Sequence, residues 1–424
     1  MQGLSSPTSP LELFDEEFMR DPYPRLAELR RSTAAHCVAQ PNGLRKWLVT
    51  RYEDGRTLLA DPRLSKDMRI GYGLLEKNFT DPAKRAEFLR ESGSRRQFPR
   101  ELAEHMLDSD PPDHTRLRRL VAKVFTGRRV RDLRPQVAAL TDDLLDAAAR
   151  RGRIDLMADL AFPLPFTVIC SLLGVPLTDR EWFRRRSNLL VSGTSGDEVR
   201  DAGAEVVGYL GDLIDAKRAD PADDLLSALV HTGDGGDRLS GTELMSMAYV
   251  LMVAGHETTV NLVGNGALAL LRHPGQRALL DADPSLWPSA VEEVLRFDGP
   301  NVSSTWRFTT EPVTVGDVVI PKGEFVTVCL LAVCRDPDRY ADPDRFDIRR
   351  VNTGSLAFGH GVHHCIGAPL ARLEGEVVLS KLFQRFPEME PTVGDGDLKW
   401  RFSTMMRGLE ELPVRLFRKA SLPH

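Results

Sequence analysis

The stretch Phe358-Gly-His-Gly-Val-His-His-Cys365-Ile-Gly367-Ala-Pro-Leu-Ala-Arg places one cysteine between glycines, directly before a segment with helical character. Glycines permit sharp backbone turns, and a proline soon after them is typical of the first turn of a helix. The spacing therefore predicts that the Cys365 sulfur lies beside free N–H groups at a helix N-terminus, where the helix dipole stabilises a thiolate. Such a thiolate is a strong ligand for iron. A buried structural cysteine is the alternative. We adopt that alternative for Cys37, Cys170, Cys329 and Cys334.

Residues 358–367, called the cysteine loop below, match the pattern Phe-x-x-Gly-x-x-x-Cys-x-Gly and resemble the haem-binding loop of the cytochrome P-450 family. The resemblance implies haem b (iron protoporphyrin IX) as cofactor, with Cys365 as the iron ligand and Phe358, Gly361 and Gly367 beside the haem. It implies a monooxygenase that activates O2. The expected fold is mainly α with small β-sheets (α+β), one domain over residues 1–424 with the haem buried between a long central helix and the cysteine loop.

Composition agrees with a globular protein, since 42% of the 424 residues are hydrophobic and 28% are charged. The net charge of −5 indicates neither a nucleic-acid partner nor an anionic-membrane partner. Five scattered cysteines without a CxxC pair argue against a disulfide framework. Residues 1–20 contain no apolar signal segment, and the chain contains no run of about 18 apolar residues. We therefore expect a soluble, cytoplasmic protein. We also expect a monomer, although the sequence itself does not determine the oligomeric state.

Helical patterning dominates the chain, because apolar residues recur at spacings of three and four in several segments. The predicted helices cover residues 135–150, 199–219, 240–272, 287–297 and 369–386. Ser240-Gly-Thr-Glu243 predicts a capping box at the start of the third helix, and His273-Pro274 predicts its end. Strand-like alternation occurs at 45–50 and, broken by turns, at 313–330. We interpret residues 66–100 as a long loop with short helical pieces and 232–238 as a surface loop.

The sequence Ala254-Gly-His-Glu257-Thr258-Thr lies in the middle of the longest predicted helix. Glycine and threonine are poor residues for a helix interior, so we expect a local distortion there. Threonine hydroxyls would bond to the preceding turn, and Gly255 would leave room for a ligand. The acid Glu257 beside the Thr258 hydroxyl is a candidate proton relay. The alternative is a solvated kink with an exposed glutamate. By resemblance this is the oxygen-binding groove, with Ala254 and Gly255 beside the haem and with Glu257 and Thr258 as catalytic acid and hydroxyl.

Glu293 and Arg296 are three residues apart on a predicted helix, a spacing that favours an ion pair on one face. The family joins such a pair to an arginine in a later segment, and Arg345 in Pro343-Asp-Arg-Phe fits that position. The resemblance thus implies a buried structural triad of Glu293, Arg296 and Arg345 that supports the cysteine loop. Loss of one partner would leave an unpaired buried charge.

His114 and Arg118 are four residues apart on a helix predicted to start near Pro111-Pro112, so both face the same way. Haem carries two propionates, and buried carboxylates need charged or hydrogen-bonding partners. By the family pattern, Arg307 and His363 complete the set. The expected propionate-binding residues are therefore His114, Arg118, Arg307 and His363.

The resemblance also implies a substrate pocket. Its expected lining residues are Leu251, Ala254, Val302, Ser303, Ser304, Thr404 and Met405, with residues 66–100 and 189–195 as the lid. Small, apolar or weakly polar side chains suit a bulky, modestly oxygenated molecule. The segment from Phe297 to Arg307 is similar to its counterpart in actinobacterial enzymes that tailor macrolides and other polyketides. We therefore expect hydroxylation or epoxidation of such a small molecule in antibiotic biosynthesis.

No flavin, nicotinamide or iron–sulfur motif is recognisable in the sequence. By the resemblance, electrons come from a separate ferredoxin and its ferredoxin reductase. They would dock near the Cys365 face, where Arg116 and Arg119 are candidate contacts.

Several alternatives remain open. A peroxide-using relative usually lacks the acid–threonine pair, which Glu257-Thr258 retains. A non-oxygenating haem-thiolate enzyme, or a non-catalytic haem sensor, would share the cysteine loop. A zinc-binding module is the alternative from a different class, although crowding within six residues disfavours a four-ligand site. Its ligands would be His360, His363, His364 and Cys365.

Overall fold

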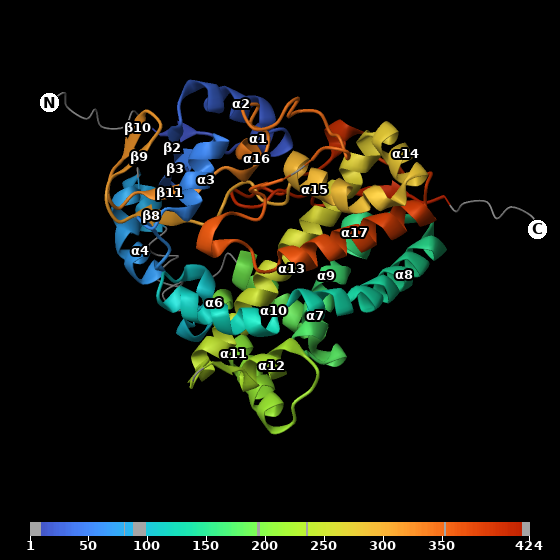
Figure 1. Ribbon diagram of the computed structural model, residues 1–424, viewed down its shortest axis with the longest axis horizontal. Helices are drawn as coiled ribbons and strands as arrows, with labels where there is room; N and C mark the ends of the chain where they lie inside the picture. The colour runs from blue at the N-terminus through green and yellow to red at the C-terminus, as the bar shows by residue number, and fades with distance from the viewer. Residues whose placement is uncertain are drawn as a thin grey trace, which may run out of the picture.

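The computed structural model describes residues 10–79, 81–87, 99–192, 196–234, 236–351 and 353–417. Within them, helices form most of the molecule and a mixed sheet lies at one end (Figure 1). The strand order of this sheet is β1-β2-β3-β11-β8-β4. Its strands are β1 (Leu11–Glu12), β2 (Ala35–Ala39), β3 (Arg45–Val49), β11 (Phe325–Val328), β8 (Arg307–Thr309) and β4 (Leu64–Ser65).

The strands arise where the sequence alternates. Residues 45–50 form β3, whose Trp47 pairs in parallel with Val326 of β11. Residues 313–330 form a hairpin of β9 (Val313–Val315) and β10 (Val318–Ile320), followed by β11. Both regions are therefore confirmed as strands. The remaining short strands are β5 (Arg153–Asp155), β6 (Gly233–Asp234), β7 (Asp237–Arg238), β12 (Glu390–Pro391) and β13 (Pro413–Arg415).

Five long helices form where the apolar spacing predicts them. They are α8 (Arg134–Arg151), α11 (Gly196–Ala219), α13 (Gly241–Arg272), α15 (Trp287–Asp298) and α17 (Ala368–Arg385). Their ends lie within three residues of the prediction. The other helices are α1 (Glu16–Arg20), α2 (Tyr23–Ser32), α3 (Tyr52–Ala60), α4 (Met68–Leu75), α6 (Asp113–Val124), α7 (Gly127–Asp132), α9 (Pro163–Leu172), α10 (Arg180–Ser192), α12 (Leu225–His231), α14 (Pro274–Ala282) and α16 (Leu330–Val333).

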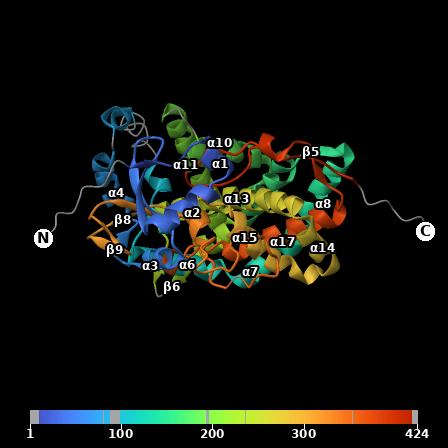
Figure 2. The ribbon, with the colours of Figure 1, turned by 90° about the horizontal axis from the view of Figure 1, so that it is seen from above.

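Helix α13 crosses the middle of the molecule, and α9, α15 and α17 pack against it (Figures 1 and 2). The predicted capping box is present, with the Ser240 hydroxyl accepting from the Glu243 N–H and the Glu243 carboxylate accepting from the Ser240 N–H. At 32 residues the helix is about 48 Å long. It continues as α-helix through residues 254–259, so the predicted distortion does not interrupt it.

One hydrophobic cluster includes residues from Ala34 to Leu416 and joins the helical layer to the sheet. The prediction of a single domain over 1–424 stays a prediction. The predicted loop at 66–100 contains α4, and its residues 80 and 88–98 lie outside the described residues. The predicted surface loop at 232–238 instead pairs β6 with β7. A search of the described helices finds none with the length and hydropathy that a membrane-spanning segment needs.

Candidate functional site

The cysteine loop folds back on itself before α17. The Cys365 N–H donates to Phe358 O at 2.9 Å, and Gly359 and Gly361 have φ of 74° and 73°. At Gly361 a Cβ would lie 2.9 Å from Leu59 O, so a larger residue would collide with the backbone. These glycines set the position of the cysteine relative to the helix that follows.

The Cys365 sulfur lies at the N-terminus of α17, as the sequence predicts. Burial raises the pKa of its thiol, while hydrogen bonds from the N–H groups of Gly367 and Ala368 lower it. The positive charges of Arg118 and Arg372 also lower this pKa. The Cys365 side chain is nevertheless still accessible to solvent, although the surrounding protein atoms are close enough to affect its pKa. Because a coordinated metal replaces the thiol proton, these donors would then stabilise a thiolate.

One face of α13 carries three of the predicted residues. Leu251, Ala254 and Thr258 follow at spacings of three and four and share this face. Ala254 is exposed although it lies in the middle of a mostly buried helix. The Thr258 hydroxyl donates to Ala254 O at 2.9 Å, which confirms the predicted bond to the preceding turn. The Glu257 carboxylate is 3.7 Å from the Arg401 guanidinium, an ion pair that the sequence did not indicate.

Gly255 does not leave room for a ligand as predicted. A Cβ at Gly255 would lie 3.3 Å from Cδ1 of Ile169 in α9. The missing side chain therefore permits close packing of α9 on α13. The prediction was wrong because sequence spacing did not show which neighbour faces this side of the helix.

Glu374 of α17 is a buried acid that the sequence reasoning missed. It is 1% exposed, and neither carboxyl oxygen has a hydrogen-bond partner among the described residues. Burial raises its pKa to about 8, and the neighbouring Thr259 hydroxyl opposes this shift only in part. That hydroxyl donates instead to Gly255 O at 3.2 Å. A signal was available, because Glu374 falls on the apolar face of a predicted helix.

Five basic side chains converge beside the cysteine loop, and they are called the cation cluster below. They are Lys66, His114, Arg118, Arg307 and His363. The rings of His114 and His363 are 4.2 Å apart, and Arg118 Nη2 donates to His364 O at 2.5 Å. Burial, followed by the charges of the other four members, lowers the pKa of His363 to about 2. The four predicted residues are thus brought together, and Lys66 is an addition that the sequence reasoning assigned to the lid.

The cation cluster lacks matching anions. Among the described residues, no member forms an ion pair within 4 Å, although Arg307 is only 6% exposed. His114 is 2% exposed, and neither of its ring nitrogens has a hydrogen-bond partner. Buried donors of this kind need acceptors. The two propionates of a haem would supply them, so the residues present fit the group that the resemblance implies.

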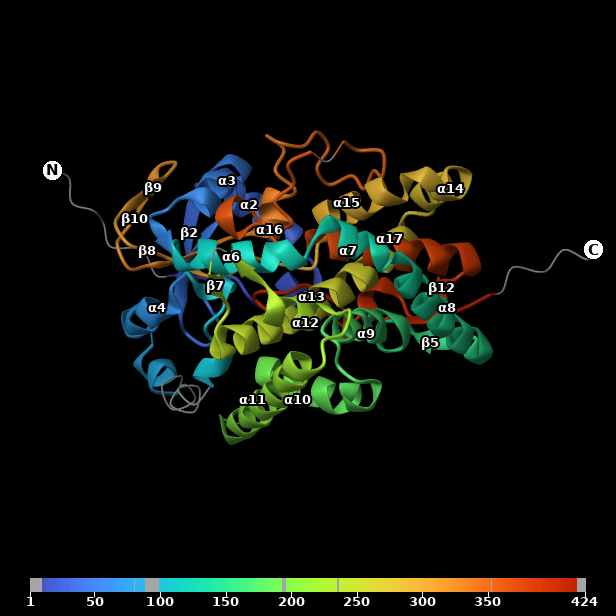
Figure 3. The same cartoon turned by 60° about the horizontal axis from the view of Figure 1, so that its bottom comes forward.

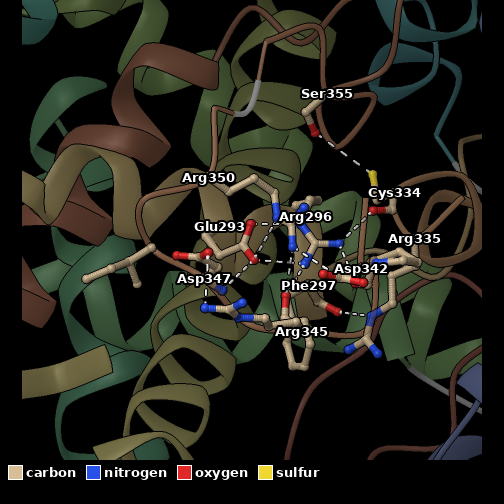
Figure 4. A network of polar contacts seen from close by, with 12 residues as sticks. Glu293, Arg296, Phe297, Cys334, Arg335, Asp342, Arg345, Asp347, Arg350 and Ser355 are labelled. Atoms are coloured by element: carbon tan, nitrogen blue, oxygen red, sulfur yellow. Dashed lines mark hydrogen bonds and ion pairs between the residues drawn. The ribbon is translucent and has the colours of Figure 1, made fainter. Parts of the chain in front are cut away.

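The predicted Glu293–Arg296 pair is fully buried (Figure 4). Arg296 Nε and Nη2 donate to the two Glu293 oxygens at 2.7 and 2.8 Å. Its remaining donors reach three backbone carbonyls, at Cys334 (3.1 Å), Pro343 (2.7 Å) and Arg345 (3.1 Å). All five guanidinium donors are therefore used. This geometry is that of a structural support.

Arg345 does not complete the triad as predicted. Its side chain is 64% exposed and lies 3.7 Å from Asp347, and only its backbone carbonyl joins the network. Arg350, 13% exposed, takes the expected position, with Nε 3.4 Å from a Glu293 oxygen (Figure 4). Irregular backbone separates the two arginines, so the sequence could not show which one turns inward.

The predicted substrate-lining segments are adjacent in space. The Val302 N–H donates to Met405 O at 2.8 Å, and the Ser303 hydroxyl donates to Thr404 O at 3.2 Å. The Ser304 hydroxyl accepts from the Val328 N–H at 3.1 Å, so it serves the local backbone. The Val302 side chain packs in a separate hydrophobic cluster at 3% exposure, and its role as a lining residue stays a prediction.

Two further observations concern predicted interactions. Arg116 forms ion pairs with Asp237 (3.1 Å) and Glu243, and its contact with a redox partner stays a prediction. Among the described residues, which include all four predicted zinc ligands, no group of three or more His, Cys, Asp or Glu could hold a metal ion. The zinc-binding module is therefore not supported.

Comparison with known proteins decides the family. The family model for cytochrome P450 matches residues 285–403, which include Glu293, Arg307 and Cys365. Cytochrome P450 107B1 of Saccharopolyspora erythraea is 49% identical over 402 residues, covering 95% of this chain and 96% of that protein. The chain belongs to the cytochrome P450 family.

The chain is similar in sequence to a hydroxylase and in structure to a P450 monooxygenase. The 6-deoxyerythronolide B hydroxylase of Saccharopolyspora erythraea is 44% identical, with 96% of this chain and 98% of that protein covered. The tirandamycin C-bound structure of the P450 monooxygenase TamI matches with a TM-score of 0.84 at 46% identity, covering 96% of this chain and all of that one. The predicted mainly helical fold with small sheets is confirmed. The chain is a cytochrome P450 monooxygenase related to macrolide and polyketide hydroxylases, and its family implies a haem-thiolate cofactor.

Proposed function

We propose that this cytochrome P450 hydroxylates or epoxidises a macrolide or related polyketide, with electrons from a separate ferredoxin and ferredoxin reductase. The observation that carries the proposal is the pairing of two features on facing helices. Cys365 lies at the N-terminus of α17, and Glu257 with Thr258 lies on α13, which packs against α17. The 44% identity to a 6-deoxyerythronolide B hydroxylase favours the substrate class.

Each residue has a stated part in the proposal. When bound, the haem-thiolate group supplies activation of O2 and insertion of one oxygen atom into the substrate. Cys365 would hold the iron, and the N–H groups of Gly367 and Ala368 would stabilise the negative charge of its sulfur. Glu257 would take protons from solvent, and the Thr258 hydroxyl would pass them along the same face of α13.

The face of α13 that carries Ala254 also orients the substrate. Ala254 is exposed there beside the buried Leu251, and both are apolar; Thr404 and Met405 are half-buried on the neighbouring segment. These side chains exclude water and leave orientation to shape and to a few polar contacts. A bulky, modestly oxygenated ring fits such a lining better than a charged metabolite does.

The first test is the carbon monoxide difference spectrum of the dithionite-reduced protein. A strongly red-shifted Soret band is expected from an iron–thiolate bond. A band at the position of histidine-ligated haem, or no haem in folded protein, would refute the assignment of Cys365. Cys365→Ser is the matched variant, and it should lose the red-shifted band.

Substrate class is tested next, by spin-state titration with a panel of macrolactones, glycosylated macrolides, linear polyketides and sterols. Turnover is then measured with a surrogate ferredoxin, its reductase and 18O2, with detection by mass spectrometry. We expect one labelled oxygen in a macrolactone or polyketide product. Equal turnover with hydrogen peroxide alone would favour the peroxide-using alternative, and a sterol as sole product would overturn the substrate class.

A further inference from the structure

Lys66 is the buried lysine of the cation cluster. Its side chain is 1% exposed, and Nζ donates to Thr305 Oγ1 at 2.8 Å. Arg307 Nη1 donates to the carbonyl of the same Thr305 at 3.2 Å. One residue therefore receives both cationic side chains, so Lys66 and Arg307 are held close together.

The backbone around Lys66 is fixed by Asp110. The Asp110 carboxylate accepts from the Lys66 N–H at 2.9 Å and from the Ser65 hydroxyl, and its carbonyl accepts from the His114 N–H at 2.9 Å. Asp110 thereby ties the end of β4 to the start of α6. This connection brings Lys66 and His114 to the same place from different parts of the chain.

The acid that anchors Lys66 does not pair with its ammonium group. Asp110 contacts the backbone of Lys66, and Nζ lies more than 4 Å from every described carboxylate. Burial lowers the pKa of Lys66 to about 7, and the nearby charge of Arg307 adds to this effect while Asp108 and Asp110 oppose it. A buried ammonium beside other cations is unfavourable unless an anion joins them.

We propose that the Lys66 ammonium binds a haem propionate, as a fifth group beside His114, Arg118, Arg307 and His363. The inference rests on the proposed function, because it takes haem as the cofactor. Two propionates offer four oxygens, and a lysine hydrogen-bonded to a single neutral hydroxyl has donors left for one of them. Thr305 would hold Lys66 and Arg307 near each other for this contact.

The alternative is that Lys66 only supports the turn between β4 and α4. Its backbone bond to Asp110 and its apolar stem would serve that role without the charge. The two interpretations differ in what they predict for a substitution that keeps the stem. Only a propionate contact makes haem retention depend on the ammonium group.

The test compares Lys66→Met, Lys66→Arg and the control Lys322→Met, which removes an exposed lysine on a surface turn. The rate of haem release from the holoenzyme to a haem-scavenging globin is measured for each. We expect release on the order of tenfold faster for Lys66→Met, a rate close to wild type for Lys66→Arg, and no change for Lys322→Met. Equal release from Lys66→Met and wild type would overturn the proposal.

A second measurement separates a propionate contact from a structural effect. Wild type and Lys66→Met are reconstituted with iron protoporphyrin IX dimethyl ester, which lacks both negative charges. The difference in release between the two proteins should then disappear. A difference that persists with the ester would assign Lys66 a purely structural role.

The carbon monoxide spectrum keeps this test distinct from that of the proposed function. If wild type lacks the red-shifted band, the assignment of the cofactor itself fails. If wild type and Lys66→Met both show the band and release haem equally fast, only the role of Lys66 is refuted.

Discussion

The Arg401 guanidinium lies 3.7 Å from the carboxylate of Glu257, so a residue of the C-terminal segment places a positive charge beside the acid of α13. Glu257 is 18% exposed and Arg401 is 37% exposed at their side chains. A pair with this exposure contributes little to stability. The pair instead fixes the position of the Glu257 carboxylate on α13. Figure 3 shows α13 crossing the molecule.

Arg401→Gln should therefore impair proton delivery more than folding. We expect the product formed per electron pair to fall about two- to fivefold, the order of one weak ion pair. The substrate KM should stay the same, and the solvent kinetic isotope effect on turnover should rise. Lys399→Gln is the control, because it removes a neighbouring exposed pair with Glu411 (3.0 Å). An isotope effect unchanged from wild type would rule out this role for Arg401.

The two arginines near Glu293 give a contrast within one segment. Arg350→Met removes a partner from a fully buried carboxylate and should lower the free energy of unfolding by about 2–4 kcal/mol, because Arg296 remains. Arg345→Met alters an exposed side chain and should change the free energy of unfolding by less than about 0.5 kcal/mol. Urea unfolding and haem content measure both effects. A larger loss of stability for Arg345→Met than for Arg350→Met would support the triad with Arg345 that the sequence predicts.

Gly361→Ala tests the shape of the cysteine loop. A φ of 73° and a Cβ 2.9 Å from Leu59 O make alanine unfavourable there, by about 1–3 kcal/mol. We expect a lower haem content and loss of part of the red-shifted carbon monoxide band. Gly396→Ala is the matched control, since a Cβ there meets nothing within 4 Å. Full haem occupancy in Gly361→Ala would show that the loop tolerates a different backbone.

Local sequence determined much of the fold. Apolar spacing and the Ser240–Glu243 capping box predicted α13 because these signals act within a few residues of one another. The position of Cys365 at the N-terminus of α17 was predictable for the same reason, because the cysteine loop and this helix are continuous in the chain. Glu293 and Arg296 pair within one helical turn, so their contact also followed from spacing.

The site residues that were missed depend on contacts between distant segments. Lys66 joins the cation cluster through Asp110 and Thr305, and Arg401 reaches Glu257 from the far end of the chain. No periodicity surrounds these residues, so their direction is set by tertiary packing. Gly255 was misjudged for a related reason, because Ile169 of another helix occupies the space beside it.

The last prediction concerns Glu374, the buried acid of α17. The folded protein keeps its proton up to a pKa of about 8, whereas in an unfolded chain the pKa lies near 4.5. Between these values the folded state binds more protons than the unfolded state. The free energy of unfolding therefore falls as the pH rises through this window. Glutamine at this position is neutral at every pH and lacks this dependence.

Glu374→Gln should accordingly match wild type near pH 4.5 and exceed its stability at pH 7, by about 3 kcal/mol at 1.36 kcal/mol per pH unit. Urea midpoints of both holoproteins between pH 5 and 8 measure the difference, and contributions of the cofactor cancel when the two are compared at each pH. Glu388→Gln, at an exposed position beyond the same helix, should follow wild type throughout. Parallel curves for Glu374→Gln and wild type would mean that Glu374 is already ionised and paired in the folded enzyme, because only a retained proton makes the two curves diverge.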